Sequence, residues 1–176
     1  KFSKFYRKDI NKISNFFSSS LFKNKKFKLI TAISMFYDLP DPLKFAKEIN
    51  SILSKNGVWH IELSYMPMMI KNTSYDTICH EHLEYYSLTS IKFLLDKAKL
   101  KIVNISFNQI NGGSIALDVA RQSSKYKRSN HLINWILENE KLNEYNSVKK
   151  QKEFFKQCKI HKILLKKLIV NLKRRP

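Results

Sequence analysis

The sequence of 176 residues predicts an α/β fold in which a partly parallel sheet is followed by helices. The first observation is a strand–helix–strand pattern between residues 28 and 64, because such a unit joins parallel strands by a right-handed crossover. Two further β-prone runs, at residues 100–107 and 114–120, complete the sheet, and from about residue 129 the apolar spacing is helical. Hydrophobic residues make up 43% of the chain, which is enough to bury a core.

The first half of the chain carries the clearest element boundaries. Residues 28–35 form a near-continuous β-prone run, typical of a buried parallel strand. Asp41 has the chemistry of an N-cap with Pro42 at the first helical position, and Asn56-Gly57 is expected to close the helix. Residues 58–63 form the next strand. Shorter elements are expected earlier: a helix end at residues 1–8, a strand at 9–13 and a loop at 15–18.

The second half begins with a segment, residues 64–87, in which neither a helical nor a strand period holds. A helix is expected at residues 88–98, and Gly112-Gly113 between the last two strands permits positive φ or a close backbone approach. In the C-terminal helix, apolar residues recur at steps of three and four, which is typical of a buried face. They are Phe154, Cys158, His161, Leu165, Leu168 and Leu172.

Composition narrows the class of protein. The net charge of +19 suggests an acidic partner, but the basic residues are mostly Lys and are spread along the chain, which favours a solvated surface over nucleic-acid readout. Cys79 and Cys158 follow no disulfide or metal spacing, which fits a reducing cytoplasm. No apolar run is long enough for a membrane span. We therefore expect a cytoplasmic protein with no membrane partner and no specific nucleic acid, and leave its oligomeric state open.

Titratable side chains concentrate between residues 74 and 87. His80 and His82 stand two residues apart, so both point the same way in an extended segment. A zinc signature needs a second ligand pair at a set spacing, which the chain lacks, and the HExxH pattern fails at Glu84. No metal site is therefore expected. Histidine beside carboxylates favours acid–base chemistry, and the alternative that these are satisfied polar residues of a buried loop stays open.

The order of several motifs resembles the S-adenosylmethionine-dependent sugar C-methyltransferases, which methylate carbon 3 of nucleotide-linked 4-keto-deoxysugars. The resemblance runs from residue 1 to at least Arg121. The motifs are residues 34–39 (SMFYDL), 64–67 (SYMP), 75–88 (YDTICHEHLEYYSL) and 111–114 (NGGS).

The resemblance implies a role for each site residue. His82 is the general base that removes a proton next to the ketone, and Glu81 holds the sugar or the imidazole. Cys79 stands where many members carry a tyrosine that is thought to assist proton transfer, so Tyr85 or Tyr86 must take over that role or the rate falls. The implied substrate-binding residues are Tyr65, His80, Tyr85, Tyr86 and Asn111. The implied S-adenosylmethionine-binding residues are Asn15 (an acid in the family), Phe16, Met35, Phe36 and Tyr37.

The resemblance also implies a partial Rossmann-like class I methyltransferase sheet without its N-terminal strands. Residues 1–74 would be the cofactor-binding half. Residues 75–176 would be the C-terminal region, with a catalytic loop at 75–87, sheet completion at 100–120 and helices at 129–173. Because the glycine-rich first loop, the acid that ends the second strand and a zinc module are missing, an internal fragment of marginal stability is expected. The alternatives are an inactive truncated or split gene product and a basic nucleic-acid-binding protein.

Overall fold

Four strands form one mixed sheet in the order β1-β2-β4-β3. The structure, a computed structural model, describes residues 6–173. The strands are β1 (Phe27–Ile33), β2 (Leu53–Ser64), β3 (Leu100–Asn108) and β4 (Ser114–Arg121). The helices are α1 (Pro42–Ile52), α2 (Met66–Asn72), α3 (Leu88–Lys97), α4 (Asn130–Leu142) and α5 (Val148–Lys173). The predicted α/β class is confirmed.

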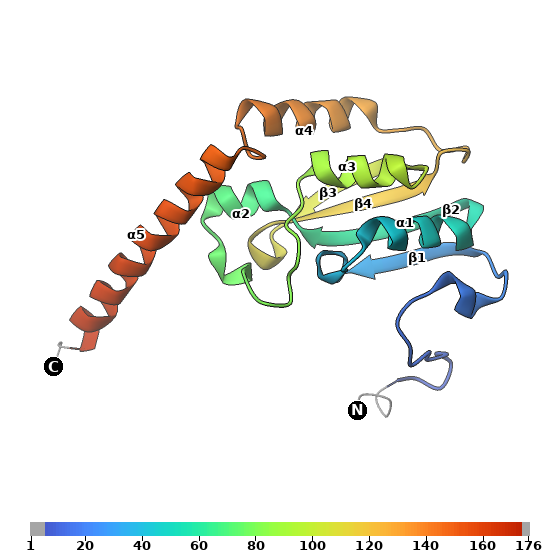
Figure 1. The fold of residues 1–176 in the computed structure, drawn as a ribbon, viewed down its shortest axis with the longest axis horizontal. Coiled ribbons are helices and arrows are strands. Elements are labelled where there is room, and N and C mark those ends of the chain that lie inside the picture. Colours follow the sequence, from blue (N-terminus) through green and yellow to red (C-terminus); the bar gives the residue numbers. More distant parts are fainter. Residues whose placement is uncertain (1–5, 174–176) are drawn as a thin grey trace.

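The parallel part of the sheet is the predicted strand–helix–strand unit. β1 pairs parallel with β2 through α1, whereas β2 pairs antiparallel with β4 and β4 pairs antiparallel with β3. Asp41 caps α1, because its carboxylate accepts the backbone N–H of Lys44 at 2.9 Å, and Pro42 follows it as expected. In Figure 1, α1 and α3 lie over the same face of the sheet.

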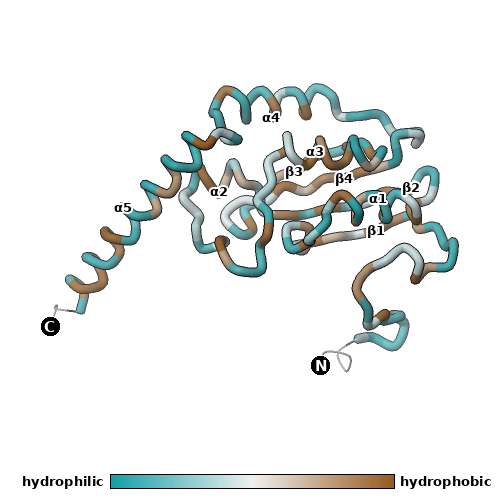
Figure 2. Tube along the Cα trace, viewed as in Figure 1, coloured by the Kyte–Doolittle hydropathy of each residue, from teal (hydrophilic) through white to brown (hydrophobic). Residues whose placement is uncertain are grey.

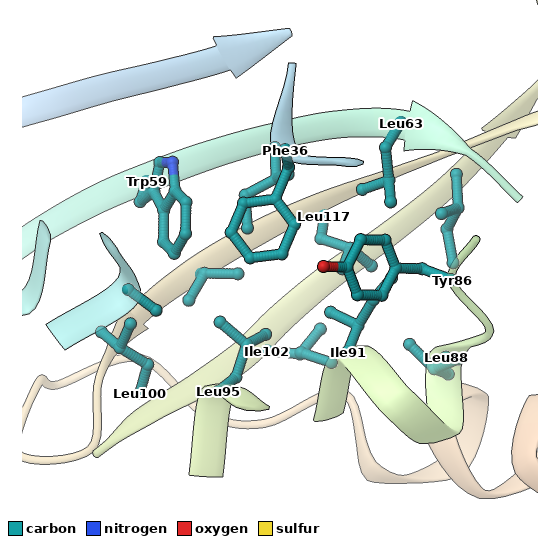
Figure 3. Packing of buried hydrophobic residues seen from close by; sticks show 14 of the residues in the cluster. Phe36, Trp59, Leu63, Tyr86, Leu88, Ile91, Leu95, Leu100, Ile102 and Leu117 are labelled. Carbon is teal, nitrogen blue, oxygen red and sulfur yellow. The ribbon is translucent and has the colours of Figure 1, made fainter. Parts of the chain in front are cut away.

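One core runs through the sheet and across the expected boundary at residues 74 and 75. On β2, Trp59, Ile61 and Leu63 alternate toward the core and are at most 1% exposed. Leu117 of β4 meets them, and the ring of Phe36 packs on Trp59 with centroids 5.8 Å apart (Figure 3). The core therefore holds Phe36, and with it the turn that follows β1, in place. That turn lies at the edge of the sheet where the candidate site is found.

The predicted end of the first helix was wrong. α1 ends at Ile52, and Asn56-Gly57 lies inside β2, where the pairing with β1 shifts register. A Cβ atom on Gly57 would lie 2.7 Å from the carbonyl oxygen of Phe27. The glycine is needed for the close approach of β1, and it does not act as a helix cap.

Four other predictions differ from the structure. Residues 9–13 form no strand and are exposed, and residues 6–8 are not helical; residues 1–5 of the expected helix end lie outside the described part. The segment that lacked a period contains the seven-residue helix α2. The stripe on α5 is buried only at Phe154 and half-buried at Cys158, and from His161 onward it is exposed, so the predicted buried face was wrong there. Figure 2 shows hydrophobic and hydrophilic residues alternating along α5.

The sheet has an edge at β1. Leu29 and Ile33 on this strand are 62% and 56% exposed, so apolar side chains line an edge without a partner among the described residues. The marginal stability expected of the isolated chain stays a prediction. Among residues 6–173, no helix combines the length and apolar character needed to cross a membrane.

Candidate active site

The segment between Ser74 and Ser87 is attached to the carboxyl end of β1. The backbone N–H groups of Leu83 and Glu84 both donate to the carbonyl oxygen of Tyr37, at 3.0 and 3.2 Å. Tyr37 belongs to a short turn after β1, and that turn follows Ser34, which has a left-handed φ of 53°. A non-glycine residue with this φ is strained and frequently marks a functional site. The structure therefore brings the predicted catalytic segment to the edge at which open α/β sheets bind ligands.

His82 lies between two tyrosines. Its ring centroid is 4.2 Å from that of Tyr37 and 6.2 Å from that of Tyr85. Tyr37 is 5% exposed, and His82 is half-buried, so one face of the imidazole is packed and the rest of the ring stays accessible. Tyr37, expected as a cofactor residue, thus forms the support of the predicted base.

The phenols around His82 stay protonated well into the alkaline range. Burial raises the pKa of the Tyr37 hydroxyl, a hydrogen bond from the Ser34 side chain opposes this, and the neighbouring Asp38 and Cys79 add to it. Burial also raises the pKa of Tyr85, again with a contribution from Cys79. The Tyr85 hydroxyl oxygen is buried, and beyond the backbone of Cys79 it has no hydrogen-bond partner among the described residues.

The other two members of the Cys-His-Glu-His run point away from this cluster. The side chains of His80 and Glu81 are 92% and 73% exposed, and the closest approach of His80 Nε2 to a Glu81 carboxylate oxygen is 3.9 Å. At this exposure and distance the pair adds little stability. The structure groups Cys79 with His82, Tyr37 and Tyr85, and leaves His80 and Glu81 open to a ligand.

A buried carboxylate holds the C-terminal end of the segment. Glu140 of α4 is 1% exposed and accepts four hydrogen bonds: from the Tyr65 hydroxyl at 2.6 Å, from Leu88 N at 2.6 Å, from Thr89 N at 3.0 Å and from the Thr89 hydroxyl at 2.6 Å. Tyr65 follows β2 and caps α2, and Leu88 and Thr89 start α3, so Glu140 joins the end of the segment to the residue that follows β2. Its negative charge also suits a helix N-terminus.

Tyr65 and Tyr86, both expected to contact substrate, are largely enclosed. Burial and the hydrogen bond to Glu140 raise the pKa of Tyr65 far above its ordinary value. Tyr86 is 4% exposed, its ring packs against Phe36 at 5.4 Å, and burial raises its pKa as well. The Tyr86 hydroxyl has no partner among the described residues.

The long helix α5 reaches the first turn of the segment. The Tyr75 hydroxyl lies 2.9 Å from His161 Nδ1. A cavity of about 320 Å³ separates α5 from the segment and α2, with Tyr85 and Glu84 on one wall and Phe154 on the other. α5 is thus the wall of the site on the side away from the sheet.

The residues expected to hold the cofactor divide into exposed and buried ones. Phe16 is fully exposed, Asn15 is exposed, and both border a shallow, open hollow in the loop of residues 12–16. Phe36 is a core residue at 1% exposure, so only its backbone is available, whereas Met35 is half-buried. The two groups are joined through Phe45 of α1, whose ring lies 4.7 Å from Phe17 and 6.2 Å from Phe36.

Asn111 lies in the turn before β4 and has a left-handed φ of 53°. The turn packs against α2, because the Asn72 amide donates to the carbonyl oxygen of Gly112 at 3.0 Å. A Cβ atom on Gly112 would lie 2.6 Å from the Ser74 hydroxyl, so the glycine permits contact with the start of the segment. Within residues 6–173, no group of three or more His, Cys, Asp or Glu side chains is arranged to bind a metal.

Comparison with known proteins identifies the family. Residues 2–105 match the model of the methyltransferase domain, which is more than half of the chain. The chain belongs to the methyltransferase domain family. It is also 28% identical over 100 residues to the C-methyltransferase NovU of Streptomyces niveus. That match covers 57% of this chain and 24% of the relative, so the chain corresponds to about a quarter of that protein.

Solved structures of methyltransferases are similar to parts of this methyltransferase domain. An S-adenosylmethionine-dependent methyltransferase from Clostridium acetobutylicum superposes with a TM-score of 0.45 at 16% identity, over 56% of this chain and 59% of that one. A putative methyltransferase from Bacillus halodurans superposes with a TM-score of 0.47 at 12% identity, over 62% of this chain and 73% of that one.

Two features of the domain's site were missed in the sequence. The contact between Tyr37 and His82 joins segments that share no local pattern. The burial of Glu140 could have been predicted from its spacing. It stands seven residues after Ile133 and four after Ile136, which places it on the buried face of α4. A lone acid on an apolar helical face indicates a carboxylate with buried partners.

Proposed function

We propose that the chain carries the catalytic segment of an S-adenosylmethionine-dependent C-methyltransferase that acts on a nucleotide-linked keto-deoxysugar. The observation that carries the proposal is the packing of His82 on Tyr37 directly after β1. Ligands of open α/β sheets bind at this edge, so a base placed there can reach a bound substrate. Family membership and the similarity to a C-methyltransferase support the same reaction class.

The proposed role of His82 is to remove a proton from the carbon next to the ketone. The imidazole nitrogen takes the proton, and the electron pair of the broken C–H bond moves onto the ketone oxygen as an enolate. We assign the hydrogen bond to that oxygen to the Tyr85 hydroxyl, whose raised pKa keeps it protonated; the hydroxyl is buried, so the segment must open for it to reach the ketone. When bound, S-adenosylmethionine supplies an electrophilic methyl group whose bond to sulfur breaks as the new carbon–carbon bond forms, leaving a neutral thioether.

The residues present fit one end of this cofactor. Phe16 and Asn15 would hold the adenine, since a fully exposed aromatic ring offers a stacking surface and the amide offers a donor and an acceptor. Met35 and the backbone of Phe36 would border it at the end of β1. The first glycine of the chain is Gly57, so the residues before β1 contain no glycine-rich loop for the other end of the cofactor.

The exposed residues of the segment are assigned to the sugar. His80 and Glu81 present their polar groups to solvent on the open side, where they contact the incoming substrate. Tyr65 and Tyr86 would support the sugar site from the packed interior. Asn111 would contact the sugar from the turn before β4. Cys79 lies near both tyrosines beside His82.

The test is transfer of a labelled methyl group from S-adenosylmethionine to a thymidine-diphosphate-linked 4-keto-deoxysugar. His82→Asn is expected to lower the turnover by about 10²–10⁴-fold, because it removes the base. His131→Asn, an exposed histidine on α4, is the matched control and should leave turnover unchanged. Methylation of oxygen instead of carbon, or full turnover by His82→Asn, would overturn the proposal.

A further inference from the structure

A second cleft, with a volume of about 270 Å³, lies on the opposite side of α2 from the cavity beside α5. It is enclosed by α2, the ends of β2 and β3, and α4. Aromatic and other apolar side chains line its walls, together with one lysine and one amide. They include Tyr65, Phe107, Trp135, Lys71 and Asn139.

The aromatic residues leave ring surface open toward the cleft. Trp135 is 65% exposed and Phe107 is 47% exposed, although both are large apolar side chains. The ring of Phe107 is held by that of Tyr65, with centroids 5.4 Å apart and an interplanar angle of 54°. Exposed aromatic rings beside a hollow suit a flat aromatic ligand, which gains by stacking.

The charge of the cleft favours an anion. Lys71 in the last turn of α2 is the one charged residue among those that line it, and no Asp or Glu side chain is among them. Glu140 lies behind Tyr65, but it is 1% exposed and its oxygens are occupied by four hydrogen bonds. The Asn139 amide adds a donor and an acceptor at the rim, where they can pair with the polar edge of a base.

We propose that this cleft binds the nucleoside diphosphate part of the substrate. The nucleobase stacks on Trp135 and Phe107, the amide of Asn139 pairs with its edge, and the ammonium group of Lys71 binds a phosphate. The identity of the whole substrate rests on the proposed function, whereas the binding itself rests on the cleft. The keto-sugar end of the same molecule is then left for the segment that carries His82.

Trp135 makes the binding directly measurable. The chain has two tryptophans, and Trp59 is 0% exposed, so a ligand that quenches fluorescence on contact reports on Trp135. Thymidine diphosphate titrated into the full chain should quench it saturably, and thymidine or pyrophosphate alone should bind more weakly. By calorimetry, Trp135→Ala should weaken binding of thymidine diphosphate at least about fivefold, the lower bound of one lost stacking contact.

Lys71→Gln should also weaken binding and reduce its dependence on salt, since it removes a phosphate contact. Phe93→Ala and Lys47→Gln are the matched controls, because they remove an exposed aromatic ring on α3 and an exposed lysine on α1, and they should leave the affinity unchanged.

The outcomes separate this inference from the proposed function. Absence of saturable quenching, or equal affinity in Trp135→Ala and the unmodified chain, would overturn the cleft assignment. Methyl transfer with an unchanged KM in Trp135→Ala would overturn it too, while leaving the proposed function in place. Nucleotide binding that depends on Trp135, without methyl transfer to the keto-sugar, would uphold the cleft and overturn the proposed function.

Discussion

Replacing Glu140 by Gln should loosen the segment that carries His82 without changing the size of the side chain. The four donors around Glu140 come from Tyr65, Leu88 and Thr89, and all point at its two carboxylate oxygens. A glutamine keeps one acceptor oxygen, which can still serve Tyr65 and Leu88. Its amide nitrogen would face the backbone N–H of Thr89, which would then lose its acceptor. The Thr89 hydroxyl can rotate and accept from that amide.

The magnitude follows from these bonds. A hydrogen bond to a charged group contributes about 1.5–3 kcal/mol, and the bonds that remain become neutral and weaker by roughly half. The loss of the Thr89 N–H bond and the weakening of the others together lower the free energy of unfolding by about 2–4 kcal/mol. A domain has roughly 5–15 kcal/mol in total, so the loss is large. The N-terminus of α3 keeps its cap at Ser87, whose hydroxyl accepts from Ser90 N.

Urea unfolding measures this loss directly. With a slope of about 1–3 kcal/mol per molar urea, the midpoint of Glu140→Gln should fall by roughly 1–2 M. Amide hydrogen exchange at Leu88 and Thr89 should accelerate more than at β4. Glu138→Gln, an exposed acid on the same helix, serves as the control and should unfold like the unmodified chain. A midpoint for Glu140→Gln within experimental error of the control would refute the reasoning.

Three further changes test the fold around the site. Gly113→Ala should lower the free energy of unfolding by about 1–3 kcal/mol in thermal melts, because Gly113 has φ 125° and its Cβ would lie 2.6 Å from that of Met68; an unchanged Tm would contradict the close packing. Asp41→Ala should lose about 1 kcal/mol with the cap on Lys44 N, and Asp41→Asn should keep most of it. Burial and the hydrogen bond to Glu140 raise the pKa of Tyr65 in the folded state, so its contribution to the free energy of unfolding is complete below about pH 10. As the pH rises further, that contribution falls by about 1.4 kcal/mol per pH unit. Urea titrations at several pH values should show a flatter loss of stability with pH for Tyr65→Phe, and an equal loss in both proteins would argue against it.

The elements that could be predicted are those that show a pattern among residues close together in the sequence. β1, α1 and the antiparallel pair β3 and β4 each show a β-prone or periodic run near capping or turn residues, and the structure places them close to where they were expected. The helix α2 escaped because seven residues are too few to establish a period. Gly57 was misread because a glycine after a helix and a glycine under a neighbouring strand look alike in sequence, and only the 2.7 Å approach of Phe27 separates them.

The candidate site likewise has residues that could be predicted from the sequence and contacts that could not. The residues between 74 and 87 could be singled out because their histidines, tyrosines, acids and thiol are neighbours in the chain. The contacts that position them could not, because they are long-range: Glu140 lies 52 residues from Leu88, and Tyr37 comes from the other side of β2. The exposed half of α5 differs from its prediction for a related reason. An apolar stripe shows that a helix can be covered, but it does not show by what.

The central claim is that His82 removes a proton from the carbon next to the ketone, and deuterium exchange tests it without methyl transfer. The full-length protein would be incubated in D₂O with S-adenosylhomocysteine and a thymidine-diphosphate-linked 4-keto-deoxysugar, and the resonance of that proton would be followed by NMR. The account predicts loss of the resonance with the unmodified protein and its persistence with His82→Asn. Exchange at the same rate in both proteins would contradict the assignment of His82 as the base.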